Sequence, residues 1–230
     1  MGGQGVRQYS AGDFRGEAFA ATEPGTRWYR DLGKRWFDLT LALAITPFVG
    51  LLVAVLAAAV WASDGAKPFF GHMRVGRDGR MFRCWKLRSM VPDAQERLAA
   101  YLESNPTAAW EWAVYRKLSN DPRITRLGDF LRRTSLDELP QLWNVLRGEM
   151  SFVGPRPVTP DELEMYGAQR TAYWAVRPGI TGLWQVSGRN DVTYDERVRL
   201  DGEYLRQMSF AADLGIVLRT ARVVVRPTGR

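Results

Sequence analysis

The feature that most constrains the fold of this chain is an apolar segment that runs from Leu39 to Trp61 without a charged residue. As a helix, it is long enough to cross the hydrocarbon core of a bilayer, which is roughly 30 Å thick. It starts too far from the N-terminus and runs too long for a typical signal peptide. Flanking aromatic residues resemble interfacial belts: Trp28, Tyr29 and Trp36 before it, and Trp61, Phe69 and Phe70 after it. The segment therefore predicts membrane contact.

Basic residues flank the segment at both ends: Arg27, Arg30, Lys34 and Arg35 before it, and Lys67, Arg74, Arg77 and Arg80 after it. Because cationic flanks tend to stay in the cytoplasm, this pattern draws both ends to the cytoplasmic side. Within the segment, Pro47 removes one helical hydrogen bond, and the Thr46 hydroxyl can bond to the carbonyl that this frees. A re-entrant helix that breaks at Thr46-Pro47 agrees with both observations. A kinked spanning helix agrees with the second, so these residues leave both topologies open.

The composition indicates an acidic partner. At 230 residues the chain has a net charge of +7 and a pI of about 9.8, which favours nucleic acid, anionic lipid or a phosphorylated substrate. The single cysteine, Cys84, excludes an internal disulfide, and with only His72 beside it no zinc-type ligand set is available. Residues 1–30, rich in glycine, alanine and small polar residues, predict a disordered N-terminal arm. We expect a membrane-inserted segment at 31–66 and a single further domain, the catalytic one, at 67–230.

The part of the chain after the membrane segment predicts a mostly helical α/β fold with a small β-hairpin. The hairpin covers residues 68–90, and its Asp78-Gly79 step suits a primed turn. The expected helices are residues 93–118, interrupted at Asn105-Pro106, then 127–133, 139–147 and 194–225. The last of these carries arginines beside an apolar face, a pattern typical of an interfacial amphipathic helix and also of a core helix. Two stretches rich in glycine and proline, 151–157 and 177–190, are expected to be loops.

Two adjacent carboxylates, Asp137 and Glu138, stand between two hydroxyl residues and the apolar pattern of the helix expected at 139–147. Pro140 suits the first turn of that helix, which would put the acid pair at the positive end of the helix dipole. Acid pairs at this position are usually caps, so the pair by itself carries little information. Neighbours on a helix point about 100° apart, which favours two separate roles: one carboxylate attacks and the other holds a metal.

Several cations accompany the acid pair. They are Lys86 and Arg88 on the hairpin, Arg132 shortly before the pair, Arg156 between Pro155 and Pro157, and Arg189 in a glycine-rich loop. A guanidinium fork matches the oxygens of a phosphate, and phosphates together with carboxylates favour Mg²⁺. This combination predicts a site that handles phosphorylated substrates at a membrane surface.

Three blocks of the sequence resemble the signature blocks of the bacterial sugar transferase family, the monotopic phosphoglycosyl transferases: residues 134–144, 148–157 and 177–190. The hairpin segment 82–90 and the apolar segment with Pro47 are also similar, so the resemblance extends from about Lys34 to Arg226. In length and loop motifs the chain is most similar to the short members that initiate exopolysaccharide synthesis, of the galactose-1-phosphate transferase type.

The resemblance implies a two-step reaction. Asp137 would attack the sugar-proximal phosphate of a UDP-sugar, release UMP and retain the hexose-1-phosphate, with galactose or glucose as the expected sugar. Undecaprenyl phosphate would then displace the aspartate. Glu138 would hold Mg²⁺, and Arg132 and Arg156 would hold phosphate near Lys86.

The resemblance also implies a location. The Thr46-Pro47 step is similar to the Ser-Pro break of a re-entrant helix in this family, which is inserted in the bacterial cytoplasmic membrane with the catalytic domain on the cytoplasmic face. Interfacial amphipathic helices, a homo-oligomer and downstream glycosyltransferases are further expectations. The sequence carries no nucleic-acid motif. Two alternatives are a membrane-anchored phosphohydrolase that forms an aspartyl-phosphate, and a non-enzymatic basic membrane adaptor.

Overall fold

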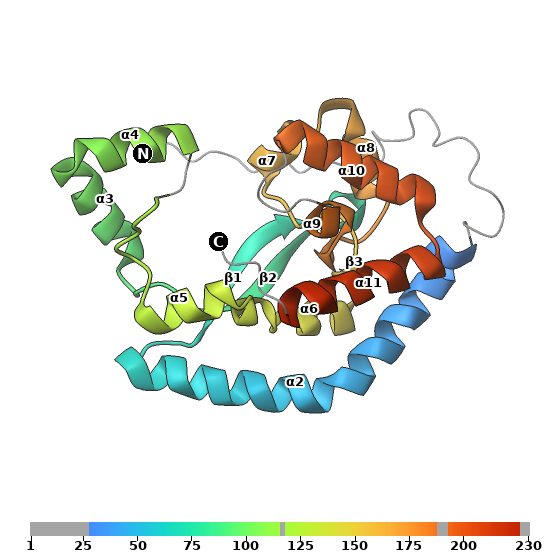
Figure 1. Cartoon of the computed structure of the whole chain (residues 1–230), viewed down its shortest axis with the longest axis horizontal. Coiled ribbons are helices and arrows are strands. Elements are labelled where there is room, and N and C mark those ends of the chain that lie inside the picture. Colours follow the sequence, from blue (N-terminus) through green and yellow to red (C-terminus); the bar gives the residue numbers. More distant parts are fainter. Residues whose placement is uncertain (1–27, 116–117, 188–192, 226–230) are drawn as a thin grey trace. The chain divides into compact units, whose positions relative to one another are not determined.

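The computed structural model describes residues 28–115, 118–187 and 193–225, which are mostly helical and contain two small sheets (Figure 1). The first half comprises η1 Tyr29–Gly33, α2 Lys34–Asp64, β1 Phe69–Val75, η2 Arg77–Gly79, β2 Met81–Leu87, α3 Ala94–Ser104, α4 Pro106–Tyr115 and α5 Arg126–Arg133. The second half comprises η3 Leu136–Glu138, α6 Gln141–Arg147, β3 Ser151–Val153, α7 Pro160–Glu164, η4 Gly167–Gln169, α8 Arg170–Trp174, β4 Gly179–Thr181, α9 Leu183–Ser187, α10 Tyr194–Gln207 and α11 Phe210–Val225. The mostly helical composition with small sheets is as expected.

The chain forms two compact units. The first comprises the described parts of residues 1–47, 71–84 and 141–230, and the second comprises 48–70 and the described parts of 85–140. Each unit has a core of its own, built around Tyr173 and Tyr204 in the first and around Leu87 and Leu131 in the second. Residues 1–27, most of the predicted disordered arm, lie outside the described residues. The expected division into arm, membrane segment and catalytic domain stays a prediction.

The hairpin and the first helices follow local sequence signals. Strands β1 and β2 pair, and in the turn between them Asp78 and Gly79 have φ values of 58° and 72°. Both values are positive, as a primed turn requires, which confirms the predicted turn. Helices α3 and α4 are separated at Asn105, as expected. Trp110 on α4 is 62% exposed.

The first unit contains a short parallel sheet that the sequence analysis missed. Strands β3 and β4 pair with Ser151 opposite Gly179 and Val153 opposite Thr181, so the prediction of loops was wrong for these residues. The two backbones approach closely at glycines, because a Cβ at Gly179 would overlap the backbone nitrogen of Gly154. Helix α11 packs on both strands, and α9 packs against α10 and α11.

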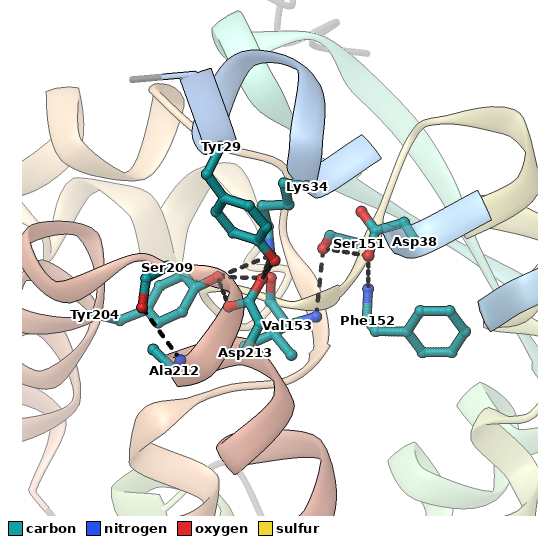
Figure 2. Close-up of polar contacts among 10 residues, drawn as sticks. All are labelled: Tyr29, Lys34, Asp38, Ser151, Phe152, Val153, Tyr204, Ser209, Ala212 and Asp213. Atoms are coloured by element: carbon teal, nitrogen blue, oxygen red, sulfur yellow. Dashed lines mark hydrogen bonds and ion pairs between the residues drawn. The ribbon is translucent and has the colours of Figure 1, made fainter. Parts of the chain in front are cut away.

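The predicted single helix at 194–225 is two helices. Met208 ends α10 with a ψ of 116°, which is not helical. The Ser209 hydroxyl then accepts a hydrogen bond from the Ala212 backbone nitrogen at 3.2 Å and caps the start of α11 (Figure 2). On α11, Ile216 is buried, whereas Leu218 is 54% exposed. This helix therefore has an inner face on the sheet and an apolar outer face.

A buried polar network fastens the start of α2 to the C-terminal helices of the first unit (Figure 2). Lys34 Nζ donates to Asp213 Oδ2 at 2.5 Å and to the Tyr204 hydroxyl at 2.8 Å. The Tyr29 hydroxyl donates to Asp213 Oδ2 at 2.7 Å. Tyr29 is only 6% exposed, so its expected place in an aromatic belt was wrong. Lys34 likewise serves as an internal ion-pair partner instead of an exposed flanking charge.

Asp38 adds a second attachment in the same unit. Its Oδ1 accepts hydrogen bonds from the Ser151 hydroxyl at 2.9 Å and from the Phe152 backbone nitrogen at 3.0 Å (Figure 2). One turn earlier on the same helix, Arg35 donates to the carbonyls of Val145 and Leu146 at 2.6 and 2.9 Å. The polar residues that precede the apolar segment therefore bind the N-terminal end of α2 to β3 and to the end of α6.

Helix α2 is long and apolar enough to cross a membrane. Its most apolar window has a mean hydropathy of 2.5, and only 6% of that window is buried. The helix continues through Pro47 without a non-helical residue, so the described helix contains no interruption at the Thr46-Pro47 step. The Thr46 hydroxyl donates to the Ala42 carbonyl at 2.7 Å. The expectation that it bonds to the carbonyl freed by Pro47, which is that of Leu43, was therefore wrong by one residue.

Candidate active site

The acid pair lies in a short turn that precedes α6. Asp137 and Glu138 belong to the 3-10 turn η3, and α6 begins only at Gln141. The acid pair therefore precedes α6, as expected, whereas Pro140, which was expected in the first turn of that helix, lies one residue before it. Ser135 adopts a left-handed conformation with a φ of 57° and makes no side-chain cap, whereas the Thr134 hydroxyl bonds back to Phe130 in α5. The turn is thus an extension of the α5 end, in the second unit.

Lys86 on β2 contacts both carboxylates. Its Nζ lies 2.6 Å from Glu138 Oε1 and 3.7 Å from Asp137 Oδ2. The residue Asp137 is 6% exposed, whereas Glu138 is half-buried. The shorter contact is a charge-assisted hydrogen bond, which fixes Glu138 beside the more deeply buried Asp137. The expectation that Lys86 approaches the acid pair is therefore met in geometry, while its role in binding substrate stays a prediction.

The placement of Lys86 depends on how the chain after β2 joins the start of α5. The Ser89 carbonyl accepts a hydrogen bond from the Thr125 backbone nitrogen at 3.2 Å, and Met90 pairs with Ile124 in an isolated bridge. Helix α5 can approach this segment because a Cβ at Gly128 would overlap the Ser89 carbonyl oxygen. A glycine on the buried side of α5 thus lets the strand that carries Lys86 run beside the helix that ends at the acid pair.

The groups around Asp137 shift the pKa of its carboxyl in opposite directions. Burial raises the pKa of the Asp137 carboxyl above its ordinary value, the Lys86 charge lowers it, Glu138 raises it, and Arg132 lowers it. Burial is the largest of these effects, so the carboxyl holds its proton to a higher pH than an exposed aspartate does. Arg132 is itself exposed, on the last turn of α5. The acid pair therefore has two cations, Lys86 and Arg132, within electrostatic reach.

Arg88, the second cation predicted on the hairpin, has partners that the sequence analysis missed. Its guanidinium donates to both carboxylate oxygens of Asp64, at 2.5 and 2.6 Å, and to the carbonyl of Lys67 at 2.8 Å. A bidentate pair of this kind joins the end of α2 to the end of β2 within the second unit. A phosphate-binding role for Arg88 stays a prediction, since the structure already gives its donors an intramolecular partner.

The remaining two predicted arginines lie elsewhere in the chain. Arg156 is exposed and follows β3 in the first unit, on the loop whose Gly154 packs against the backbone of Arg177 and Gly179. This close packing, together with the flanking prolines, holds the loop rigidly. Arg189 lies outside the described residues. The phosphate-binding roles of both arginines stay predictions.

The acid pair fits a magnesium ion in one particular mode. Among the described residues, no group of three or more histidine, cysteine or acidic side chains gathers at one place, so an all-protein cage is not part of the described chain. Mg²⁺ is commonly held by one or two carboxylates, with water and substrate phosphates as its other ligands. Glu138, with Asp137 beside it, can contribute such carboxylates, although Lys86 already contacts Glu138 Oε1.

Comparison with known proteins identifies the family. The model of the bacterial sugar transferase family matches residues 29–227. The chain belongs to the bacterial sugar transferase family. This confirms the resemblance noted in its sequence blocks. In this family member, the block at 134–144 holds η3 and the first residues of α6, the block at 148–157 holds β3, and the block at 177–190 holds β4 and α9.

Relatives of this chain are found in several bacteria. The "UDP-galactose-lipid carrier transferase" of Erwinia amylovora is 52% identical over 198 residues, covering 85% of this chain and 41% of that protein. The "undecaprenyl-phosphate galactose phosphotransferase" of Salmonella typhimurium is 50% identical over 196 residues, with the same two coverages of 85% and 41%. The "exopolysaccharide production protein ExoY" of Rhizobium meliloti is 48% identical over 198 residues, covering 86% of this chain and 88% of that protein. The chain thus spans about two-fifths of the first two relatives, at 41% each.

Proposed function

We propose that the chain transfers hexose-1-phosphate from a UDP-sugar to undecaprenyl phosphate, releases UMP, and thereby initiates exopolysaccharide repeat-unit synthesis. The observation that carries the proposal is the placement of Asp137, a residue that is 6% exposed and whose carboxylate Oδ2 lies 3.7 Å from Lys86 Nζ. A carboxylate that is shielded from water but compensated by cations is suited to attack phosphorus. Relatives named for UDP-galactose and for undecaprenyl phosphate support galactose as the first choice of sugar, with glucose second.

The proposed reaction has two displacements at one phosphorus atom. In the first, an Asp137 oxygen bonds to the sugar-proximal phosphorus, the bond from phosphorus to the bridging oxygen breaks, and UMP leaves with the electron pair. In the second, a phosphate oxygen of undecaprenyl phosphate bonds to the same phosphorus, and Asp137 leaves as a carboxylate. A covalent intermediate lets a soluble donor and a lipid acceptor use one site in turn.

The basic residues are proposed to stabilise negative charge during both displacements. Lys86 and Arg132 act on Asp137 and on the charge that develops on UMP, because preorganised cations need little rearrangement as the charge forms. The contact of Lys86 with Glu138, at 2.6 Å, orients the second carboxylate. Glu138 would hold Mg²⁺, which supplies neutralisation of phosphate charge when bound. Arg156 is proposed to hold substrate phosphate from its rigid loop.

Helix α2 is proposed to insert into the cytoplasmic membrane as a re-entrant helix, with the catalytic residues on the cytoplasmic face. Support comes from its exposed apolar surface, since Phe48 is 78% exposed and Leu51 70% exposed. Basic residues on both sides of the apolar segment favour two cytoplasmic ends. A lipid acceptor also requires an active site at the membrane. Glycosyltransferases that extend the lipid-linked sugar are the expected downstream partners.

The proposal is tested with the full-length chain in nanodiscs that contain Mg²⁺. Without acceptor, UDP-galactose or UDP-glucose should release one UMP per enzyme and add a hexose-1-phosphoryl group to the intact protein, a mass gain of hexose-1-phosphate less one water. Undecaprenyl phosphate should then remove the adduct and give continued UMP release. Asp137→Asn should abolish both signals. Asp129→Asn is the matched control, because Asp129 is exposed on α5 and pairs only with Arg133 at 3.0 Å among the interactions described for it.

Different outcomes separate the alternatives. Release of free hexose-1-phosphate without a lipid-linked product would indicate a phosphohydrolase. Absence of an adduct in the unmodified chain, with UMP release that Asp137→Asn leaves unchanged, would contradict the covalent route. A chain that neither releases UMP nor binds any UDP-sugar would leave a non-enzymatic membrane protein.

A further inference from the structure

A pocket of about 110 Å³ lies entirely within the first unit, between the loop after β3 and helices α9 and α10. Its lining includes Arg156, Tyr166, Trp184, Tyr194, Arg197 and Asp201. Arg156 is the residue that the proposed function gives to substrate phosphate. A group attached to that phosphate is therefore a natural occupant, and the chemistry of the remaining lining residues can indicate which group.

Asp201 is the most unusual residue of this pocket. It is 3% exposed, on the third turn of α10. The Tyr166 hydroxyl donates to its Oδ2 at 2.8 Å, whereas Oδ1 is buried and has no hydrogen-bond partner within the described residues. Burial raises the pKa of Asp201 to about 7. A buried acceptor without a partner destabilises a fold, so its retention calls for an explanation beyond stability.

Arg197 lies one helical turn before Asp201, on the same face of α10. Its guanidinium lies 4.7 Å from the centroid of the Trp184 ring. Its Nε is also buried without a hydrogen-bond partner within the described residues. One helix therefore carries an unpaired buried donor and an unpaired buried acceptor in two residues that line the same pocket, with Arg197 held in position by the indole ring.

The balance of charge in the pocket favours a neutral ligand. Arg156 and Arg197 share the lining with Asp201 and Glu162, of which Glu162 also pairs with Arg74 at 2.8 Å, so the pocket carries acidic as well as basic groups and does not resemble a purely cationic anion site. A nucleobase is also disfavoured, because base recognition generally uses an open aromatic face. Trp184 is only 5% exposed, and Arg197 covers its ring. A hydroxyl group, which donates and accepts at once, matches an adjacent donor and acceptor.

We propose that this pocket binds the hexosyl group of the nucleotide sugar, with Asp201 Oδ1 accepting a hydrogen bond from a sugar hydroxyl and Arg197 Nε donating to one. The inference rests on the proposed function, which supplies the nucleotide sugar. Asp201 and Arg197 are then specificity-determining residues, because galactose and glucose differ in the direction of one hydroxyl. No sequence block that resembled the family drew attention to them. Their signal in the sequence is a polar pair at helical spacing among the apolar residues Val198, Leu200 and Tyr204.

The test measures equilibrium binding by the full-length chain carrying Asp137→Asn, so that no turnover occurs. UDP-galactose, UDP-glucose and UDP are titrated separately by calorimetry. We expect Asp201→Asn to weaken the better-bound UDP-hexose about tenfold and to change UDP by less than about twofold, as loss of one hydrogen bond to the sugar requires. The preference between the two hexoses should narrow accordingly. Asp195→Asn, an exposed acid on the first turn of α10, is the matched control and should change none of the three affinities.

Three results would overturn the assignment: unchanged UDP-hexose affinities in Asp201→Asn, an equal loss of UDP affinity, or UDP-hexoses that bind the parent chain no more tightly than UDP. Arg197→Gln gives a second test if Asp201→Asn does not fold, and should weaken the same UDP-hexose without weakening UDP. UMP release by the chain with Asp137 intact separates the two proposals. Transfer without an effect of Asp201→Asn rejects the pocket alone, whereas a hexose preference set by Asp201 without UMP release rejects the transfer alone.

Discussion

Replacing Lys34 with methionine should destabilise the first unit strongly, because it removes one partner of a buried ion pair. Lys34 Nζ lies 2.5 Å from Asp213 Oδ2, and the two side chains are 5% and 0% exposed. Methionine has a similar shape but no charge, so the substitution leaves the Asp213 carboxylate buried, with the hydroxyls of Tyr29 and Tyr204 as its remaining side-chain partners among the described residues. Loss of one partner of such a pair typically destabilises a protein by about 3–5 kcal/mol.

The two remaining hydrogen bonds place the expected effect near the lower end of that range, at about 3 kcal/mol. For a chain of this size, that corresponds to a Tm lower by about 6–12 °C. Asp213→Asn should have a comparable effect, since it leaves the buried Lys34 ammonium without the carboxylate that it contacts. The double variant Lys34→Met/Asp213→Asn removes both charges and keeps an oxygen acceptor for the tyrosine hydroxyls. It should therefore be more stable than Lys34→Met alone.

The assay is thermal unfolding of the detergent-solubilised chain, followed by tryptophan fluorescence. Arg133→Met is the control, because Arg133 pairs with Asp129 across 3.0 Å on an exposed helix surface where its side chain is 71% exposed. Exposed pairs contribute little, so its Tm should match that of the parent chain. The reasoning is refuted if Lys34→Met has the same Tm as Arg133→Met. It is also refuted if the double variant loses as much stability as the two single variants combined.

Three further predictions concern the acid pair and the membrane segment. Burial raises the pKa of Asp137, and only its carboxylate form can attack, so UMP release should fall as the pH drops, with a midpoint above the pKa of an exposed aspartate. Lys86→Met removes a charge that lowers this pKa, so it should move the midpoint of the pH–rate profile to higher pH. Glu138→Gln should raise the Mg²⁺ concentration needed for half-maximal UMP release, and an unchanged metal titration would argue against Glu138 as a ligand. Pro47→Ala should shift α2 toward spanning the bilayer. Cysteine labelling in intact cells can follow this, since the native Cys84 is buried, and an N-terminal arm labelled from outside in the unmodified chain would reject re-entry.

Several features of the fold could be read from short stretches of sequence. The Asp78-Gly79 turn, the interruption at Asn105 and the apolar character of α2 depend on backbone preferences or composition within a few residues. The acid pair and Lys86 were also named from the sequence, although Lys86 and Glu138 lie 52 positions apart in the chain. There the family blocks supplied what local patterns could not, since no periodicity relates a strand residue to a distant turn.

Other features depended on contacts between distant segments. Strands β3 and β4 are three residues each, and their sequences show no alternation of apolar and polar residues. They form strands because glycines let their backbones pair. In the sequence, Asp201 is indistinguishable from an ordinary exposed acid of a helix. The packing of Tyr166 and Trp184 around α10 makes it a buried acceptor.

By itself the sequence determined the long apolar helix, the turn and helix boundaries set by glycine and proline, and the family to which the chain belongs. Only the tertiary structure decided that Lys34, which reads as a flanking membrane charge, forms a buried pair with Asp213, 179 positions away. The physical reason is that propensity and capping act within a few residues, whereas burial and charge pairing depend on which distant segments exclude water together.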